Sequence, residues 1–139
     1  MNEKISVVIR NKNQAESLDF LLSTLKKRYS DDISEIIVLD NLSTDTSSSV
    51  IQKYGVKKVS IDIFSYGGSA NIAAESATND IVVIFSAHAF PVSHDFFKLI
   101  QLKFQQNNNL AGLRCLHNQN DYVHYINGVT ATENPNGAG

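Results

Sequence analysis

Short runs of apolar, mostly β-branched residues alternate along this chain with segments that have helical spacing. The runs span residues 5–9, 35–39, 56–61 and 81–85, and a weaker run spans residues 110–116. Polar residues hardly interrupt the first, second and fourth, which is typical of strands covered on both faces of a parallel sheet. The alternation therefore predicts five strands, four of them well marked.

The segments between these runs predict helices. One apolar stripe has the i, i+3, i+4, i+7 spacing of a helix and consists of Leu18, Leu21, Leu22 and Leu25. Ser43 and Thr44 are candidate N-caps of a second helix. The negative charge of Asp45 would interact favourably with the positive, N-terminal end of the dipole of this helix.

Two further helices are expected later in the chain. Residues 69–77 predict a short helix of small side chains, and Ser93 is expected to cap another with an aromatic inward face. Strands and helices then alternate throughout, which requires right-handed crossovers. We expect an α/β fold with an open, mostly parallel sheet and helices on both faces.

Composition narrows the class of protein. The chain has 139 residues, 42% of them apolar and 19% charged, which is enough for one globular domain and excludes global disorder. The net charge is −2, so the chain has no overall positive charge that would attract nucleic acid. The chain has a single cysteine, which excludes an internal disulfide and a CxxC site. There is no secretory signal and no apolar run of the roughly 20 residues that cross a bilayer. We expect a cytoplasmic domain, with a peripheral contact at the inner face of the membrane left open.

The residues that follow each of the four well-marked predicted strands are polar or glycine-rich. These four tips read IRNKN at residues 9–13, LDNLSTD at 39–45, IFSYGGSAN at 63–71 and FSAHAFP at 85–91. Ligands of open α/β sheets bind beyond the carboxyl ends of the strands. The candidate binding residues at these tips are Arg10, Lys12, Asp40, Gly67, Gly68, Asn71 and His88.

None of the common nucleotide fingerprints is present. The chain has no GxxxxGK[ST] loop, and no GxGxxG follows the first strand. Gly67 and Gly68 precede a predicted helix, where glycine permits backbone N–H groups to approach a phosphate. A plain tight turn explains the two glycines equally well.

Three blocks together carry a resemblance to a known family. ISVVIRNKNQAESL, EIIVLDNLSTDTS and FSYGGSANIAAESATNDIVVIFSAHAFP resemble, in this order, the N-terminal half of inverting, family 2-type glycosyltransferases with the GT-A fold. The central block is similar to the family's VVDDGSTDGT. The resemblance covers residues 4–105.

The resemblance implies roles for residues at the strand tips. Arg10, Asn11, Lys12 and Asn13 would surround the base and phosphates of a nucleotide. Gly67, Gly68 and Asn71 are further nucleotide-binding candidates. Asp40 would accept a hydrogen bond from the base. Gly68 departs from the family, which has a basic residue at this position.

The family's metal motif, Asp-x-Asp, falls on Ser86, Ala87 and His88. An imidazole can ligate Mn²⁺ but brings no negative charge for Mg²⁺. The resemblance therefore implies a divalent metal, Mn or Mg, at Ser86 and His88. In the other interpretation, His88 donates a hydrogen bond directly to the diphosphate.

The resemblance also implies the reaction. An acceptor hydroxyl, on a saccharide or a lipid-linked molecule, would attack the anomeric carbon of a UDP-, dTDP- or GDP-linked sugar, with a carboxylate base removing the proton. Such reactions build surface polysaccharides and glycolipids. We expect residues 1–116 to bind the nucleotide sugar and residues 117–139 to be an irregular tail that begins a missing acceptor-side region. No residue is assigned as the catalytic base, and the chain is expected to be truncated at its C-terminus.

Other interpretations remain for the same residues. The chain can be a non-catalytic α/β module that binds a nucleotide or a partner; a receiver domain fits less well, since it needs acidic residues where IRNKN is basic. His88 can cap its strand, Asp40 can stabilise a turn, and Arg10 and Lys12 can be solvated loop charges.

Overall fold

The computed structural model describes residues 4–115 as four strands and four helices in strict alternation. The strands are β1 (Ile5–Asn11), β2 (Ile33–Asp40), β3 (Lys57–Ser60) and β4 (Ile81–Ser86). The helices are α1 (Ala15–Arg28), α2 (Ser47–Tyr54), α3 (Tyr66–Ser76) and α4 (Phe96–Gln106). Of the described residues, 4–105 belong to one compact unit and 106–115 belong to a second one.

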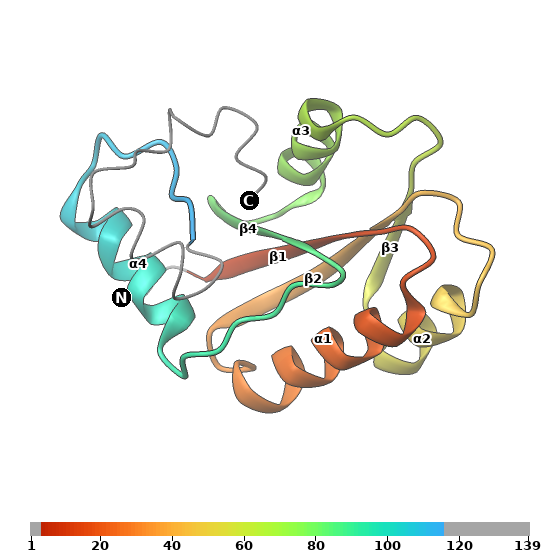
Figure 1. Ribbon diagram of the computed structural model, residues 1–139. Coiled ribbons are helices and arrows are strands. Elements are labelled where there is room, and N and C mark those ends of the chain that lie inside the picture. The colour runs from red at the N-terminus through yellow and green to blue at the C-terminus, as the bar shows by residue number, and fades with distance from the viewer. Residues whose placement is uncertain (1–3, 116–139) are drawn as a thin grey trace, which may run out of the picture. The chain divides into compact units, whose positions relative to one another are not determined.

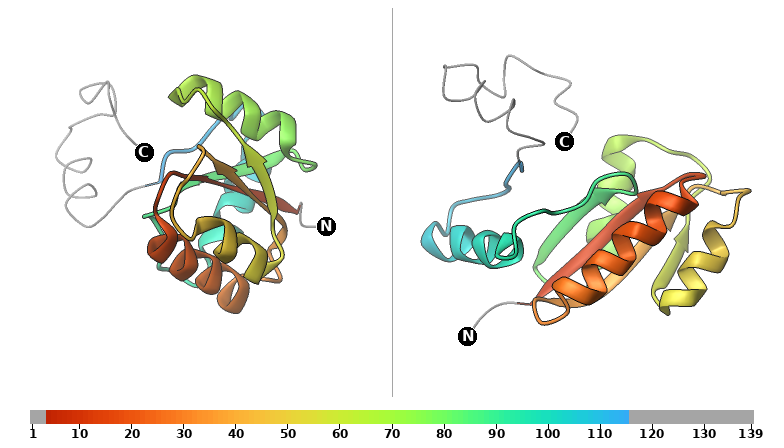
Figure 2. Two further views of the ribbon diagram at one scale, coloured as in Figure 1. Left: turned by 90° about the vertical axis from the view of Figure 1, so that its right-hand side faces the viewer. Right: turned by 60° about the horizontal axis from the view of Figure 1, so that its bottom comes forward.

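The four strands form one parallel sheet in the order β3-β2-β1-β4 (Figures 1 and 2). β1 lies in the middle and pairs with both β2 and β4 along its length, so its hydrogen bonds are satisfied on both edges. The prediction of an open parallel α/β sheet is confirmed. β1 is almost wholly buried, as its largely apolar sequence favours.

Helices cover both faces of the sheet, as expected. The larger core cluster joins α1, α2 and α4 to one face, and α3 packs against the other face around Val8, Ile37 and Leu39 (Figure 1). The leucine stripe of α1 is fully buried, and the inward aromatic face of α4 packs into the same cluster. The helical spacing in the sequence therefore identified the buried faces correctly.

The predicted fifth strand at residues 110–116 is wrong for the part that the structure describes. Residues 110–115 have no strand pairing, and residues 111–115 are exposed. A short apolar run forms a strand only when a neighbouring strand accepts its hydrogen bonds. Leu116 and the predicted tail at residues 117–139 lie outside the described residues.

Helix starts also differ from the predictions. α2 begins after Thr46, not after Ser43 or Thr44, and α3 begins at Tyr66, three residues before the predicted start. α4 begins at Phe96, where the backbone N–H of Phe96 bonds to the carbonyl oxygen of Ser93 at 3.2 Å. Among residues 4–115, no helix is long and apolar enough to span a bilayer.

We expect Leu22→Ala to lower the free energy of unfolding by about 2–5 kcal/mol, because Leu22 is fully buried in the larger core cluster. Leu102→Ala is the control, since Leu102 is 44% exposed on α4, and should change stability by no more than about 0.5 kcal/mol. Urea unfolding followed by circular dichroism measures both. Equal effects of the two substitutions would contradict the assigned core.

Candidate functional site

The carboxyl ends of three strands meet at one edge of the sheet. In the parallel register Asn11 of β1 lies beside Asp40 of β2, and Arg10 lies beside Ser86 of β4. The backbone N–H of Ala87 continues this pairing by bonding to the carbonyl oxygen of Arg10 at 3.0 Å. The predicted convergence of the strand tips is therefore confirmed for these residues.

Asp40 lies at the centre of a buried polar network. Its side chain is 2% exposed. Oδ1 accepts hydrogen bonds from Asn11 Nδ2 at 2.9 Å and from Ser43 Oγ at 2.6 Å, and Oδ2 accepts one from the backbone N–H of Ser43 at 3.0 Å. The carboxylate therefore holds the ends of β1 and β2 together and orders the turn that follows β2.

These contacts decide the protonation of Asp40. Burial raises the pKa of the carboxyl, but the hydrogen bonds from Ser43 and Asn11 outweigh it and bring the pKa below its ordinary value. Asp40 is thus a buried anion that protein donors stabilise.

Asn11 completes the network from β1. Its Nδ2 also donates to Ser47 Oγ at 2.9 Å, at the start of α2. Asn11 is 3% exposed, and its Oδ1 is buried with no hydrogen-bond partner among the described residues. The sequence placed Asn11 at the site but did not reveal that it packs inward.

Asn13 ties together the loops that follow β1 and β2. Its φ is positive, at 50°, a value that asparagine tolerates better than most residues. Its Oδ1 accepts hydrogen bonds from the backbone N–H groups of Thr44 at 2.7 Å and Asp45 at 3.2 Å. Asp45 in turn accepts from the backbone N–H groups of Ser47 at 2.9 Å and Ala15 at 3.0 Å, and so serves the starts of both α1 and α2. The helix-start role predicted for Asp45 is confirmed, whereas Ser43 belongs to the Asp40 network instead.

Arg10 and Lys12 have different environments. The Arg10 guanidinium lies 5.4 Å from the centre of the Tyr66 ring, and its Nη1 is 3.5 Å from Ser69 Oγ, so it is oriented by the first turn of α3. Lys12 is exposed. Arg10 is therefore a positioned cation at the strand ends, and Lys12 is a solvated loop charge in this structure.

The glycine pair lies in the first turn of α3, not in a separate loop. Ser65 is the N-cap: its Oγ accepts from the backbone N–H of Gly68 at 3.0 Å. A Cβ at Gly68 would lie 2.6 Å from that Oγ, whereas a Cβ at Gly67 would meet nothing within 4 Å. Gly68 is thus needed for the cap, and its N–H is already bonded. Asn71 is exposed on the following turn.

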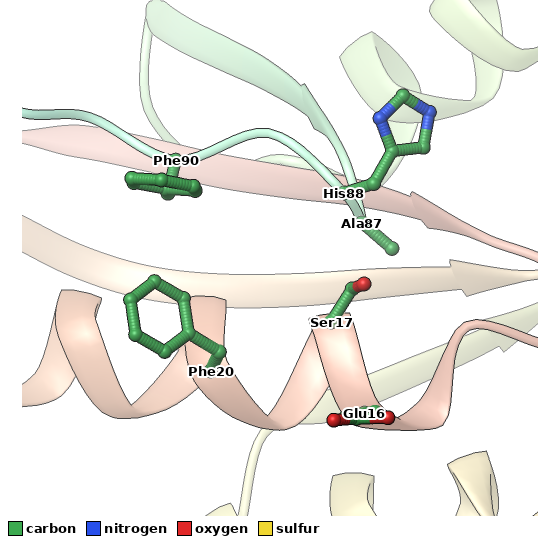
Figure 3. Close-up of a pocket in the computed structure, with 6 residues that line it drawn as sticks. All are labelled: Glu16, Ser17, Phe20, Ala87, His88 and Phe90. Atoms are coloured by element: carbon green, nitrogen blue, oxygen red, sulfur yellow. The ribbon is translucent and has the colours of Figure 1, made fainter.

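Ser86 and His88 stand at the end of β4. The carbonyl oxygen of Ser86 accepts from the backbone N–H of Ala89 at 3.0 Å, which closes a turn around the buried Ala87. His88 is exposed, and its ring points away from α1 and from Glu16 (Figure 3). Since α3 covers the face opposite α1, the imidazole is presented on the side of the sheet where Arg10 meets α3.

Ser86 and His88 do not form a metal site with other described residues. Within residues 4–115, no three His, Cys, Asp or Glu side chains lie close enough together to hold an ion. Ser86 and His88 supply one hydroxyl and one imidazole, whereas Mg²⁺ requires several oxygen ligands.

Two residues that the sequence analysis did not single out contribute to the site. Tyr66 is 70% exposed beside Arg10, and Ser69 holds the guanidinium. Both lie in the glycine-containing block, but the packing of β1 against α3 that brings Arg10 to them has no signal in the sequence.

A family model for glycosyl transferase family 2 matches residues 6–135. The chain belongs to this family. Among curated proteins, none matches the sequence significantly.

Several solved structures share the fold of this family 2 chain. A mannosyltransferase from Pyrobaculum calidifontis, in complex with GDP-Man and Mn²⁺, has a TM-score of 0.71 and 20% identity over 91% of this chain. TarS from S. aureus has a TM-score of 0.63 and 20% identity over 81% of it. Glucosyl-3-phosphoglycerate synthase from Mycobacterium tuberculosis, in complex with Mn²⁺, UDP and glucosyl-3-phosphoglycerate, has a TM-score of 0.56 and 22% identity over 64%. The matches cover 36 to 39% of those three chains, and they establish the GT-A fold.

The glycine pair gives a matched test of the α3 cap. Gly67→Ala should raise the free energy of unfolding by about 0.4–1 kcal/mol, because alanine suits a helix and the space is open. Gly68→Ala should leave the protein about 1 kcal/mol less stable than Gly67→Ala, because the new Cβ displaces Ser65 Oγ from its cap. When Ser65 is also replaced by alanine, the Gly67→Ala and Gly68→Ala proteins should be equally stable. Thermal unfolding measures the stabilities, and a remaining difference between the two proteins would contradict the cap.

The Asp40 network predicts a pH dependence. Because the pKa of Asp40 is lowered on folding, its stabilisation is present above the unfolded value of about 3.9 and is lost as pH falls through the lower folded value. Asp40→Asn should lower the free energy of unfolding by about 1–3 kcal/mol at neutral pH. The difference in this free energy between the variant and the wild type should become smaller below about pH 4. Urea unfolding between pH 7 and pH 2 measures this. A difference independent of pH would contradict the buried anion.

Proposed function

We propose that this chain binds the nucleotide-sugar donor of a glycosyltransferase that transfers the sugar to an acceptor hydroxyl. The observation that carries the proposal is the meeting of the β1, β2 and β4 ends in a family 2 chain, with Arg10 oriented at that edge. Open α/β sheets bind their ligands there. The proposed donor is a UDP-, dTDP- or GDP-linked sugar.

In this proposal the residues divide into those that contact the donor and those that shape its pocket. Arg10 and His88 contact the diphosphate, since Arg10 carries a permanent positive charge and His88 presents an exposed imidazole. The loops after β1 and β2, with Lys12 at their surface, border the base. Asp40, Asn11 and Asn13 shape these loops. Asn11 bonds to Asp40 and to Ser47, and both Asp40 and Asn13 bond to residues 43–45 in the loop after β2. Gly67, Gly68 and Asn71 form the α3 wall.

The proposed reaction replaces the bond between the sugar and the diphosphate by a bond between the sugar and the acceptor. The acceptor oxygen attacks the anomeric carbon, the bond from that carbon to the diphosphate oxygen breaks, and the diphosphate leaves with the bonding electron pair. The developing charge on the diphosphate is what Arg10 is positioned to stabilise. We assign no residue as the base that accepts the hydroxyl proton. The proposed setting is surface polysaccharide or glycolipid assembly on the cytoplasmic side, with peripheral access to a lipid-linked acceptor.

Nucleotide binding tests the proposal directly. Titration with UDP, GDP and dTDP, followed by calorimetry and thermal unfolding, should show one nucleotide that stabilises the fold by about 2.7 kcal/mol at 100 times its Kd. Arg10→Ala should weaken that binding about tenfold or more, because a charge-assisted contact to the diphosphate is lost. Lys27→Ala, which removes an exposed charge near the end of α1, is the control and should leave the Kd unchanged. Absence of binding by all three nucleotides would favour a partner-binding module.

The divalent metal is tested through His88. A metal held by Ser86, His88 and the diphosphate predicts that Mn²⁺ tightens nucleotide binding and that His88→Ala abolishes this gain. A direct hydrogen bond from His88 to the diphosphate predicts that His88→Ala weakens binding equally with and without Mn²⁺. Calorimetry of both proteins, with Mn²⁺ and with EDTA, separates the two interpretations.

A further inference from the structure

A hollow of about 270 Å³ lies between α1 and the segment that follows β4 (Figure 3). Its walls carry two aromatic rings, a carboxylate and a hydroxyl, and are formed by Glu16, Ser17, Phe20, Ala87, His88 and Phe90. Phe20 and Phe90 form a T-shaped pair with ring centres 5.1 Å apart, yet they remain 57% and 52% exposed. This hollow lies on the α1 side of the β4 end, and the donor-site contacts of Arg10 lie on the α3 side.

The segment over the hollow is held at both ends. Near β4, the backbone N–H groups of Ala87 and Ala89 bond to the carbonyl oxygens of Arg10 and Ser86, each at 3.0 Å. At its far end, Arg28 Nη2 donates to the carbonyl oxygen of Val92 at 3.1 Å. The Tyr29 hydroxyl donates to the carbonyl oxygen of Ser93 at 2.7 Å. The hollow is therefore preformed, which lowers the entropic cost of binding.

The lining matches the chemistry of a neutral sugar. Half-exposed aromatic rings can pack against the C–H face of a pyranose, while a carboxylate and a hydroxyl bond to its hydroxyl groups. The volume is below the roughly 300 Å³ at which pockets for drug-sized ligands begin, so it suits a single ring. The Glu16 carboxylate disfavours a phosphate or diphosphate here.

We propose that this hollow binds a neutral saccharide unit of the acceptor. The inference rests on the proposed glycosyltransferase function, and it adds a second binding site on the opposite side of the β4 end from the donor. A unit held here lies beside Ala87 and His88, at the end of the strand that also borders the donor site. The hollow thereby selects acceptors that carry an uncharged sugar next to the reacting unit.

Binding of simple sugars to the full chain tests this proposal. ¹⁵N-labelled protein is titrated with methyl α-glucoside, N-acetylglucosamine and maltotriose, and the backbone signals of residues 16–20 and 87–90 are followed by NMR. At least one sugar should shift these signals with saturation. Phe90→Ala and Phe20→Ala should each weaken its binding about tenfold, and Phe90→Tyr should retain it.

Phe64→Ala is the matched control for the aromatic substitutions. Phe64 is 42% exposed and forms a T-shaped pair with Tyr66, with ring centres 5.2 Å apart, but it does not line the hollow. Its substitution should leave sugar binding unchanged. If Phe64→Ala weakens sugar binding as much as Phe90→Ala does, the assigned location is wrong.

Two comparisons separate this inference from the proposed function. If UDP, GDP or dTDP binds while no sugar shifts the signals of the hollow, the saccharide site is overturned and the donor site stands. If choline, a cation that aromatic rings and a carboxylate also attract, shifts these signals and the sugars do not, the hollow is a cation site and the inference is overturned. If neither nucleotides nor sugars bind, both proposals fail.

Discussion

The pairing of β1 with both of its neighbours is the constraint on which the rest of this structure depends. β1 is the central strand, and its parallel register aligns Asn11 with Asp40 on one side and Arg10 with Ser86 on the other. A shift of one residue would turn every side chain of β1 to the other face and remove Asn11 from Asp40. The largely apolar sequence from Ile5 to Ile9, which only Ser6 interrupts, stabilises the central position but does not by itself define the register.

The polar network around Asp40 links this register to the binding edge. A buried carboxylate is costly unless donors surround it, and here Asn11 and Ser43 supply them from β1 and from the turn after β2. Asn13 and Asp45 then join the two loops through backbone N–H groups. In the proposed donor site, these residues form the walls, and Arg10 and His88 face the ligand. Tyr66 and Ser69 contact the Arg10 side chain and orient it.

The segment after β4 separates two environments. On one side it presents His88, toward the face of the sheet where Arg10 contacts α3, and this is the side proposed for the diphosphate. On the α1 side it covers a hollow with a carboxylate and two aromatic rings, which is the site proposed for a neutral sugar. The turn at residues 86–89 borders both environments, and its buried residue, Ala87, has a small side chain. In the proposed function, the donor and an acceptor sugar lie on the two sides of this turn.

The amino-acid sequence by itself determined the alternation of strands and helices, the parallel sheet, the buried stripe of α1 and the set of polar strand tips. These are short-range properties, since they follow from the period of apolar residues and from the residues next in the chain. Only the tertiary structure decided that Asn11 bonds to Asp40 and that Asn13 bonds to the loop after β2. It also decided that Gly68 belongs to a helix cap, that residues 110–115 form no strand, and that Phe20 meets Phe90. Each of these depends on a partner distant in the sequence or on space beside the backbone, and a linear pattern of residue types contains neither.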